Sequence, residues 1–235
     1  MSGGIDSSLV AKLCADAIEP QRVLGMWLGD GPPEGEDYRD ARDWAHALHI
    51  SLRAVDITAL VRAFKDLLQI DPEDNVALGN VKARVRMIVL YDTARRENRL
   101  VMGTGNKSEL LCGYFTVFGD GGVDFLPIGD LYKTQVREMA TFVGIPERIV
   151  RKIPTAGLWA GQTDQDELGV TYEVLDRVLL GMELRMSPED IAERAGVPIE
   201  TVEHVERLHR ATIHKRKPPL IPKVGIRTIG LDWRE

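Results

Sequence analysis

Residues 2–8 (SGGIDSS) could bind a phosphate group. Two glycines let the backbone approach an anion closely, and serine hydroxyls and N–H groups at a helix start can hold phosphate oxygens. Asp6 adds the hard carboxylate oxygen that Mg²⁺ prefers. No Gly-Lys-Ser/Thr follows, so the string is not a Walker A loop. A glycine turn with a serine cap is the structural alternative, and the full string favours phosphate binding.

Further strings of polar residues and glycine follow along the chain. They are 79–84 (GNVKAR), 103–109 (GTGNKSE), 119–124 (GDGGVD), 127–134 (PIGDLYKT), 154–159 (PTAGLW), 164–169 (DQDELG) and 214–215 (HK). Each has an ordinary structural explanation when taken singly. Glu109 could be a helix-start carboxylate, Arg84 and Arg86 a solvated helix face, Asp124 a turn residue, and His214 part of an exposed basic tail.

Taken together and in order, these strings carry a resemblance to known enzymes. The string SGGIDSS resembles the pyrophosphate loop of the N-type ATP pyrophosphatases, and the order of the others resembles the ammonia-dependent NAD synthetase family over nearly the whole chain. The resemblance implies a ligase that forms a C–N bond. It would amidate deamido-NAD with ammonia through an NAD-adenylate intermediate, giving NAD, AMP and pyrophosphate.

The resemblance also implies a role for particular residues. The ATP contacts are Ser2, Gly3, Gly4, Ile5, Asp6, Ser7, Thr104, Lys133 and Thr155. The magnesium ligands are Asp6 and Glu109, and the deamido-NAD contacts are Arg84, Asp124, His214 and Lys215. Lys133 would neutralise charge on the phosphates, and Asp124 would deprotonate ammonia.

The remaining expectations from the resemblance concern the cofactor and the partners. The cofactor is Mg²⁺, with ATP as co-substrate, and the enzyme is expected to be a cytoplasmic homodimer. Because 235 residues are too few for an added glutaminase domain, free ammonia or a separate glutaminase would supply the nitrogen.

Two positions depart from the family pattern. Val117 stands where the family usually has a lysine that contacts the substrate, and Lys107 is a candidate replacement. The family also carries a helix and the first central strand before the glycine-serine loop. The resemblance therefore predicts that residues 1–235 form one domain, truncated at its N-terminus relative to the family.

The elements that must position these residues alternate between helix and strand. Apolar periodicity predicts helices at 9–18, 37–48, 57–69, 76–96, 132–143, 171–182, 187–195 and 198–209, strands at 22–28, 51–56 and 99–102, and an irregular tail at 214–230. This order predicts an α/β fold with a doubly wound parallel sheet, of the adenine-nucleotide alpha-hydrolase type, followed by a helical C-terminal part.

Composition excludes several classes of protein. Apolar residues make up 44% and charged residues 28%, so the chain can bury a core and is not disordered. A net charge of −6 argues against coating nucleic acid or an anionic membrane. The two cysteines, Cys14 and Cys112, form no metal or disulfide pattern. No apolar run reaches the ~18–20 residues of a membrane span.

Three alternatives remain open at this stage. The chain could be another N-type ATP pyrophosphatase that adenylates a different acceptor, or a truncated and inactive relative. Residues 187–208 also resemble a DNA-binding helix-turn-helix. Their excess of acidic side chains would repel phosphates, which favours two packed helices.

Overall fold

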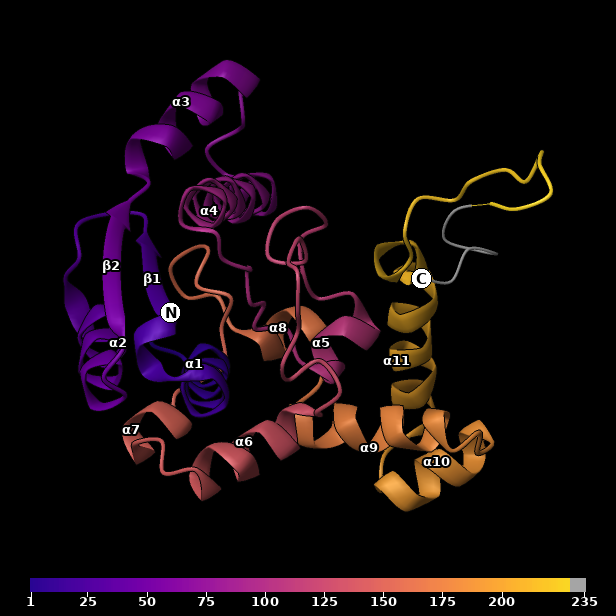
Figure 1. The fold of residues 1–235 in the computed structure, drawn as a ribbon. Coiled ribbons are helices and arrows are strands. Elements are labelled where there is room, and N and C mark those ends of the chain that lie inside the picture. The colour runs from indigo at the N-terminus through magenta and orange to yellow at the C-terminus, as the bar shows by residue number, and fades with distance from the viewer. Residues whose placement is uncertain (229–235) are drawn as a thin grey trace.

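The computed structural model describes residues 1–228 and shows an α/β protein (Figure 1). Its α-helices are α1 (Ile5–Ile18), α2 (Gly35–Ala47), α3 (Thr58–Leu68), α4 (Asn75–Glu97), α5 (Lys107–Cys112), α6 (Lys133–Phe142), α7 (Glu147–Val150), α8 (Asp164–Leu168), α9 (Tyr172–Glu183), α10 (Pro188–Ala195) and α11 (Ile199–Ala211). The strands are β1 (Leu24–Gly29) and β2 (Ser51–Asp56), and two short 3₁₀ helices are η1 (Pro20–Arg22) and η2 (Ile213–Arg216). The predicted helices are recovered with shifted ends; α1 begins at Ile5, inside the glycine string.

The sheet is parallel and smaller than predicted. β1 pairs with β2 in register from Leu24 opposite Ser51 to Gly29 opposite Asp56. The strand predicted at 99–102 is wrong as an element, because only Met102 makes a bridge, with Phe125. A strand requires a ladder of successive pairs, and this segment instead pairs with the turn that follows Gly122.

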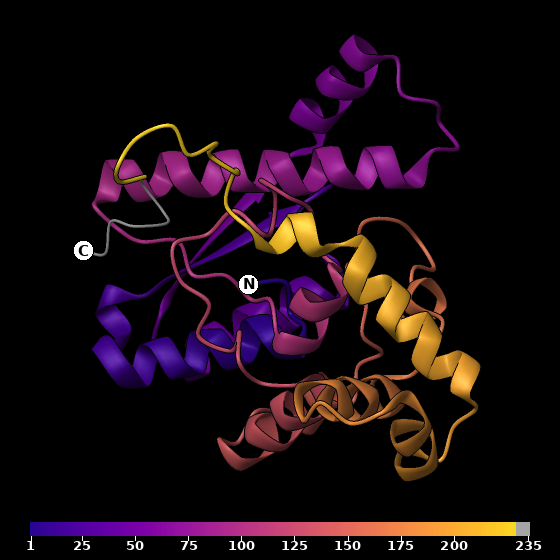
Figure 2. The ribbon, with the colours of Figure 1, turned by 90° about the vertical axis from the view of Figure 1, so that its right-hand side faces the viewer.

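Helices cover both faces of this sheet. Leu28 and Val55 pack with Val61 and Val85 of α3 and α4 on one face. Leu52 points to the other face and packs into the core formed by α1, α2, α6 and α7. This alternation is what a parallel strand buried on both sides requires. Figure 2 shows the strands between α4 above and α1 below.

A second core holds the helical C-terminal part together. It is formed by α5, α9, α10 and α11, with Leu175, Val178 and Val202 completely buried. The helix-turn-helix resemblance at α10 and α11 has a packing explanation, because Ile191 and Val205 bury their side chains in this core. The two helices are packed against α9, as their acidic surface favours.

A large cavity lies between β1 and residues 100–104. Its volume is about 1470 Å³, and its walls include β1, one face of α4, the start of α1 and the segments 100–104 and 152–160. After η2 the chain continues without helix or strand through residue 228, and positions 229 and 230 of the predicted irregular tail lie outside the described residues. Within residues 1–228, no helix has the length and apolarity needed to cross a membrane.

Candidate active site

Residues 2–8 form a tight turn that leads directly into α1. Gly3 has a φ of +86°, and a Cβ at this position would lie 2.2 Å from the carbonyl oxygen of Asp37. Only glycine therefore fits there. The Ser2 N–H donates to Ser7 Oγ at 3.1 Å, which fixes the turn. The first-turn N–H groups of a helix have no partner within the helix, so the turn presents donors suited to an anion.

Three charged side chains meet beside this turn, and we call them the charged cluster: Asp6, Glu109 and Lys133. Lys133 Nζ lies 2.6 Å from Asp6 Oδ2 and 3.2 Å from Glu109 Oε1. The Lys133 side chain is 2% exposed. The members come from the first turns of α1, α5 and α6, so three helix starts converge on one point. Here the ammonium balances the two carboxylates. If a metal cation took over that role, the ammonium could instead neutralise the negative charge of a triphosphate.

Local sequence fixes the orientation of each member. Asn106 is completely buried; its side chain accepts from the Glu109 N–H at 3.1 Å and donates to Asp6 Oδ1 at 3.1 Å. Ser108 Oγ accepts from the Lys133 N–H at 2.9 Å and also bonds Asp176 on α9. The helix cap and this hydroxyl therefore join α1, α5, α6 and α9 around the charged cluster.

Burial and charge shift the titration of the cluster. Burial raises the pKa of Glu109 to about 7, against the nearby positive charge of Lys133. Burial lowers the pKa of Lys133, but the adjacent charges of Asp6 and Glu109 more than reverse this, and its pKa is raised. The lysine is therefore charged at neutral pH, and the carboxyl group of Glu109 is close to its midpoint.

The cavity collects most of the residues predicted to bind ATP. Those that line it are Ser2, Gly4, Ile5, Asp6, Ser7, Thr104, Lys133 and Thr155, while Gly3 supports the turn from behind; the predicted magnesium ligand Glu109 lines it too. Thr104 comes from the segment after Met102, 2 residues beyond the bridge to Phe125. The ATP and metal candidates therefore share one site, although they span the chain from residue 2 to residue 155.

The residues predicted to bind deamido-NAD do not gather in the same way. Arg84 is exposed on the outer face of α4, and His214 is exposed on η2. Asp124 accepts hydrogen bonds from the Val101 N–H at 2.7 Å and from Tyr91 Oη at 3.1 Å. None of these three predicted residues is part of the cavity wall.

Lys215 lines the cavity but is already bonded to the backbone. Its Nζ donates to the carbonyl oxygens of Gly113 at 2.7 Å and Phe115 at 2.8 Å, and burial lowers its pKa. Lys107, the candidate replacement for the family lysine, pairs with Glu183 at 2.9 Å. It is not among the residues that line the cavity, and it also pairs with Asp130 at 3.2 Å.

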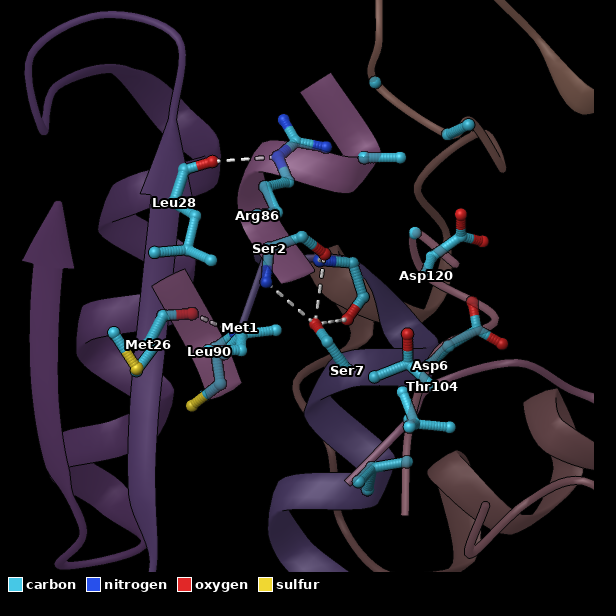
Figure 3. A pocket seen from close by; sticks show the side chains of 18 of the residues that line it. Met1, Ser2, Asp6, Ser7, Met26, Leu28, Arg86, Leu90, Thr104 and Asp120 are labelled. Atoms are coloured by element: carbon cyan, nitrogen blue, oxygen red, sulfur yellow. Dashed lines mark hydrogen bonds between the residues drawn. The ribbon is translucent and has the colours of Figure 1, made fainter. Parts of the chain in front are cut away.

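Sequence reasoning missed two charged residues of the cavity wall, Arg86 beside β1 and Asp120 near Asp6 (Figure 3). Arg86 Nε donates to the Leu28 carbonyl oxygen of β1 at 3.0 Å, and burial lowers its pKa. Asp120 also lines the cavity, and burial raises the pKa of its carboxyl group. Figure 3 shows Arg86 bonded to Leu28 beside the strand, and Asp120 close to Asp6 and Thr104. Helical spacing could have indicated Arg86, because Lys82 and Arg86 are four residues apart and share one face of α4, whereas Arg84 lies on another face.

Two more missed residues surround Lys133. Its ammonium lies 5.1 Å from the ring centre of Tyr172. Tyr172 Oη donates to Asp164 Oδ2 at 2.8 Å, while Asp164 Oδ1 is buried without a hydrogen-bond partner among residues 1–228. Nothing in the spacing of Tyr172 and Asp164 along the sequence indicates that they lie beside the charged cluster.

The sequence of this chain is similar to that of a known family of enzymes. A family model described as NAD synthase matches residues 1–219. The NH(3)-dependent NAD(+) synthetase of Methanococcoides burtonii is 46% identical over 222 residues, covering 94% of this chain and 84% of that relative. The similarity therefore includes every element that forms the cavity.

Solved structures agree with the sequence comparison. The NMN synthetase of Francisella tularensis superposes with a TM-score of 0.79 at 37% identity, and covers 94% of this chain and 86% of that one. The NH3-dependent NAD synthetase of Campylobacter jejuni gives a TM-score of 0.78 at 30% identity with the same coverages. With matches of this extent in both sequence and fold, the chain belongs to the NAD synthase family.

Proposed function

We propose that this chain is an ATP-dependent ligase that amidates deamido-NAD with ammonia, giving NAD, AMP and pyrophosphate. The carrying observation is the charged cluster, which joins the predicted phosphate turn to two carboxylates and a buried lysine at one end of the cavity. A carboxylate is a poor acyl donor, so a first step must give it a leaving group. ATP supplies that group as AMP.

The first step forms the adenylate. A carboxylate oxygen of deamido-NAD attacks the α-phosphorus, the bond to the β-phosphate oxygen breaks, and pyrophosphate leaves. Ser2, Ser7 and the N-terminus of α1 bind the pyrophosphate portion. Lys133 neutralises the negative charge that builds on it, and Thr104 and Thr155 contact the nucleotide.

The second step forms the amide. Ammonia attacks the activated carbonyl carbon, AMP leaves with the bridging oxygen, and one proton is lost to give NAD. Asp124 remains our predicted acceptor for that proton. The residues chiefly hold the two reactants in line and neutralise charge, which is the main source of rate in such transfers.

The magnesium ion would bind at the charged cluster. Asp6 and Glu109 present hard oxygens to the same point, and a cation, the Lys133 ammonium, already lies between them. Among residues 1–228 no group of three or more His, Cys, Asp or Glu could hold a metal. Asp6 and Glu109 would hold the ion through their carboxylate oxygens, and the ion would stabilise negative charge on the phosphates.

A second copy of the chain would complete the dinucleotide site. Leu67 and Leu68 of α3 and Ile88 of α4 are large apolar side chains exposed to solvent, and Ile88 lies one helical turn from Arg84. Such exposed side chains are typical of a subunit interface. We therefore propose a homodimer in which Arg84, Asp124 and His214 bind deamido-NAD outside the ATP cavity. Ile88→Asp should convert the dimer to a monomer in sedimentation analysis, and an unchanged mass would contradict it.

The remaining predictions concern architecture and setting. We keep a doubly wound parallel sheet as a proposal; it is supported by the parallel pairing of β1 with β2 and by helices on both faces of that pair. That residues 1–235 form a single domain stays a prediction. We also keep a cytoplasmic location and a nitrogen supply from free ammonia or a separate glutaminase as proposals.

The experiment is an assay of NAD, AMP and pyrophosphate with Mg²⁺-ATP, ammonium and deamido-NAD. With ¹⁸O in the substrate carboxylate, the adenylate route transfers one labelled oxygen to AMP. The result expected is stoichiometric NAD and AMP with the label in AMP. Absence of AMP, or AMP without label, would overturn the proposed reaction.

A second acceptor is favoured by one specific observation. The Francisella relative is named for NMN rather than NAD synthesis, and it is 37% identical to this chain. The carboxylate precursor of NMN carries the same reacting group. Comparing kcat/KM for that mononucleotide and for deamido-NAD in one assay decides between them.

A further inference from the structure

The segment 154–164 forms part of the cavity wall and carries Thr155. Its base is closed by the Asp164 N–H, which donates to the Pro154 carbonyl oxygen at 3.1 Å. Residues 154–160 and Gln162 line the cavity. Figures 1 and 2 both show the segment, between α7 and α8, beside the N-terminal part of α4. The contact with α4 joins two regions of the chain that are far apart in sequence.

Lys82 of α4 makes the polar part of this contact. Its Nζ donates to the Leu158 carbonyl oxygen at 2.8 Å and pairs with Asp30 Oδ2 at 2.7 Å. The Lys82 side chain is 11% exposed, so water competes weakly for its ammonium. Asp30 directly follows β1, and the lysine therefore joins the segment to the end of a strand.

Gly79 makes the close approach possible. A Cβ at residue 79 would lie 3.0 Å from Leu158 Cδ1 and 3.3 Å from Trp159 Cζ3. Gly79 and Lys82 are three residues apart on α4 and thus share a face. Gly79, which has no side chain, lets the segment come close to α4, and Lys82 donates a hydrogen bond to the backbone of the segment.

The segment is also braced on its own side. The Leu158 N–H donates to Gln162 Oε1 at 2.8 Å, and Gln162 Nε2 donates to Glu167 Oε2 at 2.8 Å. Both backbone groups of Leu158 therefore have side-chain partners, one from α4 and one from within the segment. This residue is the point at which the segment is attached to the N-terminal half.

We propose that Lys82 is a positioning residue for ATP: with Gly79, it holds the 154–164 segment against α4 so that Thr155 stays over the nucleotide end of the cavity. The proposal rests on the proposed function for its link to ATP. The contact itself is independent of the reaction. Lys82 acts through the Leu158 carbonyl and does not touch the reacting atoms.

The experiment compares Lys82→Met, Lys82→Arg and Gly79→Ala with the unchanged chain. Arg95→Met, an exposed substitution farther along α4, is the matched control. Hydrogen–deuterium exchange of peptides covering 154–162 is followed with and without Mg²⁺ and α,β-methylene-ATP. Steady-state kinetics give KM for ATP and kcat, and thermal unfolding reports global stability.

Lys82→Met should speed exchange in 154–162 by about tenfold and raise KM for ATP by about tenfold, with a smaller change in kcat. Lys82→Arg should recover most of both effects, because a guanidinium can still donate to the carbonyl. Gly79→Ala should speed exchange in the same peptides, because its methyl group displaces Leu158.

Two results would overturn the proposal. One is unchanged exchange in 154–162 for both Lys82→Met and Gly79→Ala. The other is a uniform increase across all peptides with a lower melting temperature, which would make the role one of general stability. If the unchanged chain produces no AMP, the proposed function fails, while the exchange measurements still decide whether Lys82 holds the segment.

Discussion

The two ends of the cavity are built in different ways. At one end the charged cluster has every member paired, and helix starts from three parts of the chain hold it. At the other end the wall is the edge of β1 with apolar side chains such as Met26 and Leu90, and Arg86 bonds a backbone carbonyl (Figure 3). On the proposed function, the chemistry would be concentrated at the helix starts, whereas the sheet end would chiefly support the fold.

The largest effect should come from removing the cation of the charged cluster. Lys133→Met removes the partner of both carboxylates and the charge that meets the phosphates, so kcat should fall about 10³-fold. Lys12→Met, which breaks only an exposed pair with Asp16, is the control. Thermal unfolding separates lost activity from lost structure. A kcat within a factor of ten of the starting value would contradict the assignment of chemistry to this end.

The second prediction concerns pH. The pKa of Glu109 is about 7 in the folded chain and near 4.5 when unfolded, so the folded state binds more protons between these values. Stability must then fall as pH rises from about 4.5 to 7 and level off above, by on the order of 3 kcal/mol. Urea unfolding without Mg²⁺ should show this fall.

Glu109→Gln should remove that part of the pH dependence, because the amide does not titrate. Glu138→Gln, an exposed change on α6, should retain it. The same slope in Glu109→Gln as in the unchanged chain would show that another group is responsible. The glutamine variant should also need more Mg²⁺ to reach half of its maximal rate.

At the sheet end, the expected effect is on stability. Arg86→Met leaves the Leu28 carbonyl without its donor and removes a positive charge that faces Asp30 and Asp120. We expect a loss of about 2 kcal/mol in the free energy of unfolding and less than a tenfold change in kcat. A loss of kcat as large as that of Lys133→Met would break the distinction between the two ends.

The smallest predicted effect lies behind the phosphate turn. Trp44 Nε1 donates to the Ser8 carbonyl oxygen at 3.0 Å in the core between α1 and α2. Trp44→Phe keeps most of the packing and removes this bond, which should cost about 1 kcal/mol of stability. Initial rates should stay within twofold. A larger loss of rate would mean that the bond orients the phosphate turn.

Much of the ATP site could be predicted from the sequence because its parts are short strings with local geometry. Gly3, Asp6 and Glu109 lie in such strings; the structure brings Asp6 and Glu109 together on the cavity wall and puts Gly3 in the turn beside them, while their roles in binding ATP and magnesium stay predictions. The choice between Arg84 and Arg86 could not be made from the strings alone. It depends on which face of α4 turns toward β1, and the structure turns Arg86 inward.

The sheet was harder to predict for a related reason. Residues 99–102 have the composition of a strand, but a strand exists only when a neighbour supplies the matching backbone groups. Here Met102 alone finds such a neighbour, in Phe125. The deamido-NAD contacts at Arg84, Asp124 and His214 also remain predictions, because they lie outside the cavity of a single chain.

The sequence by itself determined the local features that depend on only a few neighbouring residues, such as the ends of helices. Asn106 caps α5, Ser187 caps α10, and Gly196 ends it with a φ of +67°, each through hydrogen bonds to its own neighbours. The tertiary structure alone decided which charges meet. Lys133 and Asp6 are 127 residues apart and pair only because α1 and α6 pack side by side. Burial then strengthens that pair, since less water competes for its charges.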